Sequence, residues 1–392
     1  MADAFPERRV AWAERAASGD GTEPEQSRED GLDRRTFIRA AATGAAGTAA
    51  LAAPAIAQDR QVVKMVTTWP KNFPGLGTGA QRLADRITQV SEGRIEVKLF
   101  AAGELVPAFE SFDAVSSGAA EMYHAPDYYW QGKHKAFNFF SGVPMGFTCQ
   151  ELNSWIRFGG GQELWDELAG QFNVKCEMTG NTGAQMGGWF RNPITSIDDM
   201  KGLKIRIPGL GGEVMRQIGA SAVALPGGEI FPALQSGAID AVEWVGPYND
   251  LAFGFYKILK NYMYPGFQEG GSGIALGMNK GWWDALSETD QAVIRSCCAA
   301  ELDIMLSEFN YQNSVALNTL LTEHGVQLHR YPDDVLKELA AASENVVAEV
   351  GSGDPMSERV YASYKDFRKL IAGWSRLSEQ AYLDTRDANL EL

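Results

Sequence analysis

Cysteine and histidine are scarce in this chain of 392 residues, which contains four of each. Cys149, Cys176, Cys297 and Cys298 form no C-x-x-C pair and no dense framework, so disulfide bonds do not define the fold. Cys297 and Cys298 fall in a predicted helix and are interpreted as small buried apolar residues. The histidines show no metal-ligand spacing, and no Ser or Cys occupies a nucleophile motif such as G-x-S-x-G. These residue types give no support to an enzyme.

Basic residues are also few, since 35 Lys and Arg stand against 50 Asp and Glu, a net charge of −15 at pH 7. Nucleic acids and anionic membrane surfaces attract their protein partners through basic patches, so this charge argues against both. An anionic ligand of such a protein has to be held by a local positive site.

Long apolar runs are missing as well, and residues 1–57 do not have the pattern of a folded domain. There the run R-R-T-F-I-R at 34–39 leads into an alanine-rich segment that ends A-I-A at 55–57. This pattern is typical of a twin-arginine signal peptide and predicts cleavage after Ala57 and release into the periplasm. Residues 40–57 are too short and too polar for a membrane anchor, and no Cys lies near the cleavage site to carry a lipid.

The rest of the chain, residues 58–392, is long enough for two lobes with separate cores. Alternating apolar residues at 62–68 and 95–100 predict strands, and helical spacing at 77–91 predicts a helix between them. Such a β-α-β opening requires a crossover connection. We therefore expect a largely parallel sheet, with ligand crevices at the carboxyl ends of its strands.

The last third of the chain differs in character from the first two. From about residue 287 it predicts long amphipathic helices, which include 301–324 and 333–351, and then a polar tail. This region is expected to be a helical scaffold.

One motif occurs twice. Residues 112–121 (F-D-A-V-S-S-G-A-A-E) and 231–240 (F-P-A-L-Q-S-G-A-I-D) share the pattern F-x-A-[V/L]-x-S-G-A-x-[E/D]. Each copy predicts a short helix stopped by glycine, followed by a strand at 122–124 or 241–244. We expect these two strands to hold corresponding places in two similar α/β lobes, an arrangement that can close on a small ligand from both sides.

Arg206 is the candidate anion-binding residue. It lies near the carboxyl end of a strand predicted at 203–207, on the face opposite Leu203, Ile205 and Ile207. The planar guanidinium matches a carboxylate through two parallel hydrogen bonds. From these residues alone, a solvated arginine on an edge strand is an open alternative.

A glycine-rich segment at 209–214 follows this strand and opens a helix, so a dinucleotide-binding loop has to be considered. The segment lacks the final glycine, since Val214 stands there, and Glu213 puts a negative charge where a pyrophosphate would meet the helix. We interpret it as a strand-to-helix turn.

Gln185, Glu243, Trp244 and Glu269 form a candidate metal-binding group. Each ends or follows an apolar or glycine-rich run, where a buried polar group needs a partner. Two carboxylates, an amide oxygen and a backbone carbonyl make a hard-oxygen shell that suits Na⁺ or Ca²⁺. The alternative is that both glutamates are surface charges.

Several runs of residues in this chain are found together in one protein family. The runs L-K-I-R-I-P at 203–208 and G-A at 219–220, with the second copy of the repeated motif, resemble the periplasmic binding subunits of tripartite ATP-independent periplasmic (TRAP) transporters, the DctP family. The resemblance is strongest to the branch that binds pyruvate and other 2-oxo acids. Its matches are T-T-W-P-K at 67–71, G-N-T-G at 180–183, G-G-W-F at 187–190, P-G-L-G-G-E at 208–213 and E-W-V-G-P at 243–247.

The resemblance implies a two-lobed α/β clamp of the type II periplasmic-binding-protein kind, with a long bracing helix and a helical C-terminal region. It implies no enzymatic activity. The protein would capture a small monocarboxylate, pyruvate or another 2-oxo acid, and deliver it to the small and large membrane subunits of the transporter. Arg206 would bind the carboxylate, and Gln185, Tyr129 and Trp244 would contact the same ligand.

A metal ion in this branch bridges the carboxylate to the protein, which implies Na⁺, or alternatively Ca²⁺, as cofactor. Its ligands would be Gln185, Glu243, the Trp244 carbonyl and Glu269. A local arginine and a cation together explain how an acidic protein holds a small anion.

The resemblance also implies a division of the mature chain. Residues 58–183 and 270–310 would form lobe I, residues 184–269 and 311–340 lobe II, and residues 341–392 a helical segment through which two copies pair. Other functions left open are a lactate-binding TRAP subunit with calcium, a receptor-coupled sensor and a periplasmic enzyme on an α/β scaffold. A sialic-acid or dicarboxylate ligand would require further polar or basic groups, which the sequence does not place.

Overall fold

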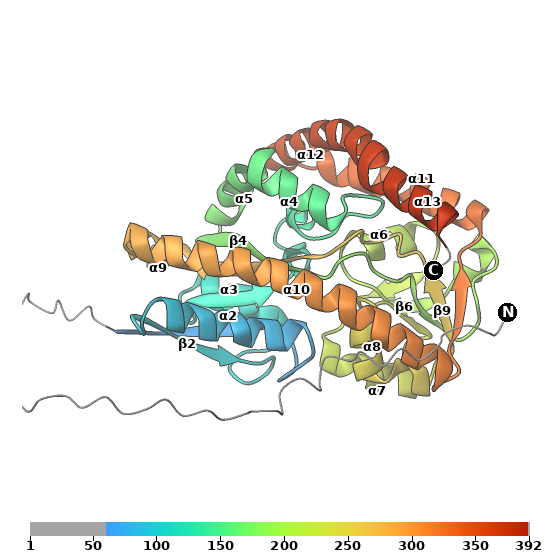
Figure 1. The fold of residues 1–392 in the computed structure, drawn as a ribbon, viewed down its shortest axis with the longest axis horizontal. Helices are drawn as coiled ribbons and strands as arrows, with labels where there is room; N and C mark the ends of the chain where they lie inside the picture. The colour runs from blue at the N-terminus through green and yellow to red at the C-terminus, as the bar shows by residue number, and fades with distance from the viewer. Residues whose placement is uncertain (1–59, 391–392) are drawn as a thin grey trace, which may run out of the picture. The chain divides into compact units, whose positions relative to one another are not determined.

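The computed structural model describes residues 60–390 (Figure 1). The predicted leader at 1–57 and its cleavage site lie outside this range. Among residues 60–390, no helix combines the length and the apolar character needed to cross a membrane.

The chain forms two sheets. The first has the order β2-β1-β3-β10-β4 and the second β11-β9-β5-β8-β6-β7. The strands of the first sheet are β1 (Gln61–Thr67), β2 (Ile95–Phe100), β3 (Met122–Ala125), β4 (Val174–Asn181) and β10 (Gly273–Asn279). Those of the second are β5 (Gly188–Phe190), β6 (Lys204–Arg206), β7 (Ser221–Val223), β8 (Ala241–Val242), β9 (Asn261–Tyr264) and β11 (Gln327–Arg330).

The two sheets are built on the same plan. In the first, β2, β1 and β3 are parallel neighbours, and β10 and then β4 follow in antiparallel pairings. In the second, β7, β6 and β8 are parallel, and β5 and then β9 are antiparallel. In each sheet all strands but one, β10 in the first and β5 in the second, therefore run in the same direction, and the expectation of a largely parallel sheet is confirmed. The two reversed strands are the ones that the chain enters when it crosses between the sheets, β5 after β4 and β10 after β9.

The repeated motif lies at equivalent places in this plan, as predicted. Its first copy forms α3 (Ser111–Ser116), and Gly118 follows at φ 80°. Its second copy forms α7 (Gly227–Ser236), which Gly237 ends at φ 75°. The strands that follow, β3 and β8, each stand between a parallel and an antiparallel neighbour. Two α/β lobes of the same construction are thus confirmed, whereas the residue limits of each lobe stay a prediction.

A single long helix braces the two lobes. The helix α10 (Glu288–Thr322) packs on α2 (Leu76–Val90) and β4 of the first lobe and on α8 (Pro247–Phe253) of the second (Figure 1). Arg82 of α2 pairs with Glu301 and Glu308 of α10 at 2.8 and 2.7 Å, and Tyr248 of α8 donates to Glu308 at 2.9 Å. The bracing helix implied by the resemblance is present. All four cysteines are buried free thiols, which confirms the interpretation of Cys297 and Cys298 as buried residues.

The C-terminal region is helical as far as Asn389, as the resemblance implied for residues 341–392. It comprises α11 (Asp333–Gly351), α12 (Pro355–Ser375), a π-helical turn (Arg376–Gln380) and α13 (Ala381–Asn389). Apolar residues at helical spacing account for these helices, because they give an amphipathic pattern to a mainly polar sequence. The exposed members are Leu370, Trp374, Leu377, Tyr382 and Leu383.

Shorter helices complete the two lobes. The α-helices are α4 (Cys149–Phe158), α5 (Gly161–Gly170), α6 (Gly209–Gln217) and α9 (Lys280–Ala285). The 3₁₀ helices are η1 (Ala108–Glu110), η2 (Asp127–Trp130), η3 (Lys135–Phe140), η4 (Ile197–Met200) and η5 (Phe255–Lys257). The helix α6 begins directly at the glycine-rich segment, in agreement with its interpretation as a strand-to-helix turn.

Candidate functional site

The two segments that carry the chain between the sheets lie side by side and bring Gln185 and Glu269 together. The Gln185 amide donates to the Glu269 carbonyl at 3.3 Å, and the Thr182 amide donates to the Ser272 carbonyl at 3.2 Å. The side-chain Nε2 of Gln185 then donates to Oε2 of Glu269 at 2.8 Å. Both side chains are buried. Residues 84 positions apart in sequence thus meet at the crossing between the lobes.

Arg206 comes to the same place from the second lobe. It ends β6, which lies between β8 and β7, and only 1% of its surface is exposed. The alternative of a solvated arginine on an edge strand is therefore wrong. Its Nε donates to the Leu225 carbonyl at 3.2 Å, and its Nη1 to the Glu243 carbonyl at 2.7 Å. Its Nη2 has a long contact, 3.4 Å, with the Tyr129 hydroxyl of the first lobe.

Backbone carbonyls thus fix the guanidinium and leave part of it available to a ligand. One hydrogen of Nη1 and those of Nη2 are not used by the two carbonyl bonds. These remaining N–H groups can donate to a carboxylate. Trp244 covers the same group, since the Arg206 Cζ lies 4.7 Å from the centre of its ring.

Glu243 and Glu269 are both buried, at 1% and 4% exposure, so the interpretation of two surface charges is wrong. Glu243 Oε2 lies 3.8 Å from Arg206 Nη1. Burial, together with repulsion from Glu269, raises the pKa of Glu243 well above its ordinary value. Burial also raises the pKa of Glu269 to about 8. In the metal-free protein one arginine does not offset the cost of ionising both groups.

The side-chain oxygen atoms of this group are suitable ligands for a bound cation. Gln185 Oε1 and Glu243 Oε2 are buried and have no hydrogen-bond partner within residues 60–390, although buried oxygens of this kind normally have one. The described residues contain no group of three or more His, Cys, Asp or Glu that could hold a metal. Two carboxylates with neutral oxygens remain, which suits Na⁺ or Ca²⁺ and not zinc or copper.

A small cavity adjoins these residues, with about 230 Å³ of empty space including its mouth. Its wall is mainly aromatic and aliphatic, with a few hydroxyl and amide groups. The lining residues are Trp69, Leu76, Tyr128, Tyr129, Thr182, Gln185, Trp244, Val245, Ser272 and Ile274. The structure therefore brings Gln185, Tyr129 and Trp244 together, beside Arg206, Glu243 and Glu269.

Several neighbours of the site were not singled out from the sequence. Gln268 Nε2 reaches toward Glu243 Oε1 at 3.4 Å and donates to the Met186 carbonyl at 2.9 Å. The fully buried Asn249 accepts from the Trp244 indole at 3.2 Å and donates to the Pro74 carbonyl of the first lobe at 2.9 Å. Of the missed residues, Tyr128 had the clearest signal, as part of the aromatic run after β3.

The comparison with known families bears on what this arrangement does. A model of the family described as bacterial extracellular solute-binding protein, family 7 (DctP) matches residues 65–354. The chain belongs to this family. DctP proteins are solute receptors of transporters and are not enzymes, which agrees with the absence of a catalytic group in the sequence motifs.

Three relatives of this DctP protein are informative. A protein from Nostoc sp. named monocarboxylate 2-oxoacid-binding periplasmic protein is 40% identical over 81% of this chain and 87% of its own length. A TRAP solute-binding protein of Bordetella bronchiseptica has a TM-score of 0.82 at 35% identity, covering 83% and 97% of the chains. A TRAP solute-binding protein from Pseudoalteromonas atlantica has a TM-score of 0.81 at 34% identity, and the match covers 85% of this chain and 100% of that protein. The Bordetella protein is a dimer with calcium and picolinate, and the Pseudoalteromonas protein holds sodium and pyruvate.

Proposed function

We propose that this protein captures a short 2-oxo acid, pyruvate foremost, and delivers it to the membrane subunits of a TRAP transporter. The observation that carries the proposal is a buried arginine beside two buried glutamates and a glutamine, at the crossing between two lobes of the same plan. The positive charge of Arg206 lies beside Glu243 Oε2 and near Gln185 Oε1, two buried oxygens that have no hydrogen-bond partner among the described residues. A small anion and a cation satisfy both when they bind together.

Each residue has a distinct part in this proposal. Arg206 orients the carboxylate through its Nη1–Nη2 edge, and Trp244 and Tyr129 pack against the ligand. Gln185, Glu243, Glu269 and the Trp244 carbonyl hold the cation. The cation supplies positive charge that neutralises the glutamates and chelates the ligand.

The chemistry of the relatives' ligands supports a 2-oxo acid. Pyruvate has a keto oxygen next to its carboxylate, and picolinate has a ring nitrogen in the same relation. Both can therefore chelate a cation through two adjacent donors. Among the described residues that line the cavity there is no cationic side chain. A second carboxylate would have no partner there, which disfavours dicarboxylates.

Lactate with calcium is the second candidate. Its hydroxyl lies where pyruvate has the keto oxygen, and calcium is the ion named for the Bordetella relative. We propose Na⁺ as the cation of this chain and Ca²⁺ as the alternative, since relatives hold either ion.

A ligand panel tests the proposal. Metal-stripped protein is unfolded thermally with pyruvate, 2-oxobutyrate, lactate and succinate, each with and without Na⁺ or Ca²⁺. A ligand at about 100 times its Kd stabilises the native state by roughly 2.7 kcal/mol, which raises the Tm by a few degrees in a chain of this size. We expect that shift with 2-oxo acids and a cation. A shift with lactate alone favours the second candidate, and no shift with any carboxylate removes the proposed ligand class.

The periplasm is the proposed location, because the leader resembles an export signal and the Nostoc relative is named as periplasmic. Cleavage after Ala57 predicts a mature protein that begins at Gln58. N-terminal sequencing of protein recovered from the periplasm checks this.

A homodimer is proposed through the C-terminal helices. Trp374 and Leu377 are 67% and 79% exposed on consecutive turns, and apolar residues so exposed commonly mark an interface. The Bordetella relative is a dimer. We expect Trp374→Asp to shift the protein toward monomer in sedimentation equilibrium, because a charge placed in an apolar interface is costly to desolvate. An exposed control outside this surface, Glu288→Gln, is expected to leave the mass unchanged, and wild-type protein that sediments as a monomer at every concentration contradicts the proposal.

A further inference from the structure

A loop of the first lobe packs against the Glu269 side chain. It runs from Gly142 to Phe147, before α4. A Cβ atom added at Gly142 would lie 2.7 Å from Cγ and 2.8 Å from Cδ of Glu269, too close for any side chain. The backbone of this loop therefore forms the wall against which the Glu269 carboxylate is set.

Two residues of the loop, Met145 and Phe147, also contact the segment that carries Glu269. The Met145 amide donates to the Phe267 carbonyl at 2.8 Å. At Gly270, an added Cβ would lie 2.6 Å from the Phe147 carbonyl oxygen. The loop thus contacts the chain on either side of Glu269 as well as its side chain, so a shift of the loop moves the carboxylate.

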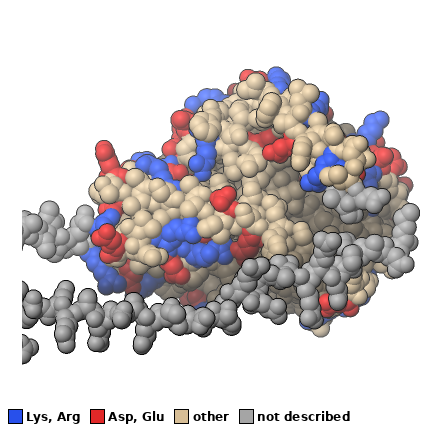
Figure 2. All heavy atoms as spheres, in the orientation of Figure 1, with Lys and Arg blue, Asp and Glu red and all other residues tan. Residues whose placement is uncertain are grey.

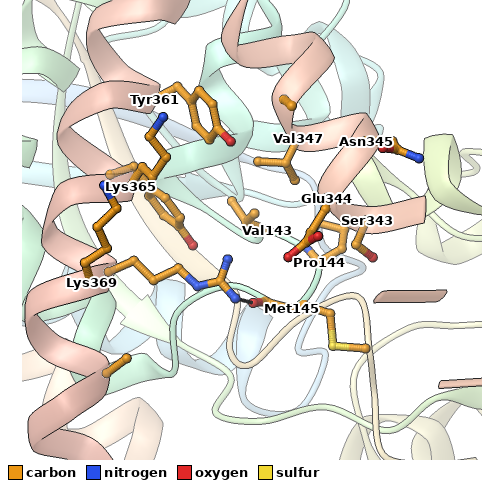
Figure 3. Close-up of a pocket in the computed structure, with 14 residues that line it drawn as sticks. Val143, Pro144, Met145, Ser343, Glu344, Asn345, Val347, Tyr361, Lys365 and Lys369 are labelled. Carbon is orange, nitrogen blue, oxygen red and sulfur yellow. Dashed lines mark hydrogen bonds between the residues drawn. The ribbon is translucent and has the colours of Figure 1, made fainter. Parts of the chain in front are cut away.

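The C-terminal helix α12 holds the loop in this position. The Tyr364 hydroxyl accepts from the Phe147 amide at 3.0 Å, and only 2% of Tyr364 is exposed. Arg368 Nη2 donates to the Met145 carbonyl at 2.7 Å, the dashed bond that ends at Met145 in Figure 3. A Cβ at Gly146 would lie 2.4 Å from the Tyr364 hydroxyl oxygen, so the loop passes close over this tyrosine.

Packing alone does not fix the outer side of the loop. A cavity of about 570 Å³ lies there, bounded by Val143, Pro144 and Met145 on one side and by α11 and α12 on the others (Figure 3). A cavity of this size admits water, so no packed side chains support the loop on that side. The two hydrogen bonds from α12 therefore carry more of the loop's restraint than they would in a filled core.

We propose that Tyr364 and Arg368 are positioning residues for the ligand site, which hold the 142–147 loop against Glu269 and thereby set the place of its carboxylate. This inference rests on the proposed role of Glu269 as a cation ligand. Neither residue touches the ligand or the cation. The C-terminal helices would then take part in binding as well as in pairing two copies.

The test is the affinity of the metal-stripped full chain for Ca²⁺, measured by calorimetry at 25 °C in wild type, Tyr364→Phe and Tyr361→Phe. Tyr361 is the matched control, because it is on the same helix, lines the same cavity and its hydroxyl makes no hydrogen bond within the described part of the chain. We expect Tyr364→Phe to bind Ca²⁺ about tenfold more weakly, as loss of one buried acceptor predicts, and Tyr361→Phe to match wild type. Faster amide exchange at Phe147 and Gly270 in metal-free Tyr364→Phe gives a readout independent of binding.

Two further variants test the inference if Tyr364→Phe does not fold. Gly142→Ala presses directly on Glu269 and is expected to weaken Ca²⁺ binding, whereas Arg368→Ala is expected to weaken it less because Arg368 is exposed. A purely structural role lowers the Tm of Tyr364→Phe without changing the Ca²⁺ Kd of the folded protein. Equal Kd values for Tyr364→Phe, Tyr361→Phe and wild type therefore overturn the inference. If wild type binds no cation with or without pyruvate, the proposed function itself fails.

Discussion

Arg206→Lys is expected to weaken pyruvate binding about 100-fold or more at saturating cation, because a buried charge-assisted pair is replaced by a group that cannot reach both oxygens. In wild type, the Leu225 and Glu243 carbonyls hold the guanidinium at fixed orientation. Lysine presents a single ammonium group and has no planar fork to be fixed this way. It also leaves these buried carbonyls with fewer donors. Calorimetric titration of pyruvate at constant Ca²⁺ measures the effect.

Arg191→Lys is the matched control for that variant. Arg191 belongs to the same lobe but is partly exposed, with 42% of its side chain accessible, and it pairs with Asp240 on the surface. Surface pairs contribute little, so its pyruvate Kd should equal that of wild type. Near-normal affinity in Arg206→Lys would remove Arg206 from the ligand site. Lysine keeps the positive charge, so a general charge effect is not the expected cause of a loss. Acidic and basic groups are interspersed on the face drawn in Figure 2.

Glu243→Gln is expected to lower Ca²⁺ affinity by at least about 100-fold, because the site then keeps one carboxylate where a divalent ion needs two. Pyruvate affinity should fall with it, down to what Arg206 supplies alone. The metal-free variant should unfold at no lower temperature than metal-free wild type, since the change removes a buried acidic group that Glu269 repels. Calorimetry and thermal unfolding with and without Ca²⁺ check both statements.

Glu213→Gln is a suitable control for this second change. Glu213 is a partly exposed glutamate of the same lobe, and it pairs with Arg216 on α6. It should keep wild-type Ca²⁺ affinity and the full rise in Tm on adding Ca²⁺. Should Glu243→Gln retain that rise as well, Glu243 is not a ligand of the cation.

Local pattern in the sequence was sufficient to predict the parts of this fold that depend on neighbouring residues. The helix-glycine-strand motif at 112–121 and 231–240 specified the equivalence of β3 and β8. The alternation at 203–207 placed Arg206 at a strand end. Both follow from periodicity and from the conformational freedom of glycine at positive φ, which act over a few residues.

Such local patterns could not predict which strands and side chains meet when they are far apart in the sequence. The antiparallel position of β10 depends on the chain returning from the second lobe, about 90 residues after β4 has left the first, and nothing local encodes that direction. The same holds for Asn249, whose bridge from Trp244 to the Pro74 carbonyl exists only because two lobes meet there. The burial of Glu243 and Glu269 likewise follows from the crossing segments, since a lone glutamate in a sequence is usually exposed.

The linkage between cation and ligand is the most direct test of the proposed function. Pyruvate is titrated into metal-stripped wild-type protein at zero and increasing Ca²⁺, and Ca²⁺ is titrated at zero and saturating pyruvate. If the cation bridges the carboxylate to Gln185, Glu243 and Glu269, each ligand should tighten the other by the same factor, about tenfold or more. A pyruvate Kd that stays constant across the Ca²⁺ series, with a parallel Na⁺ series equally flat, would contradict the bridging cation.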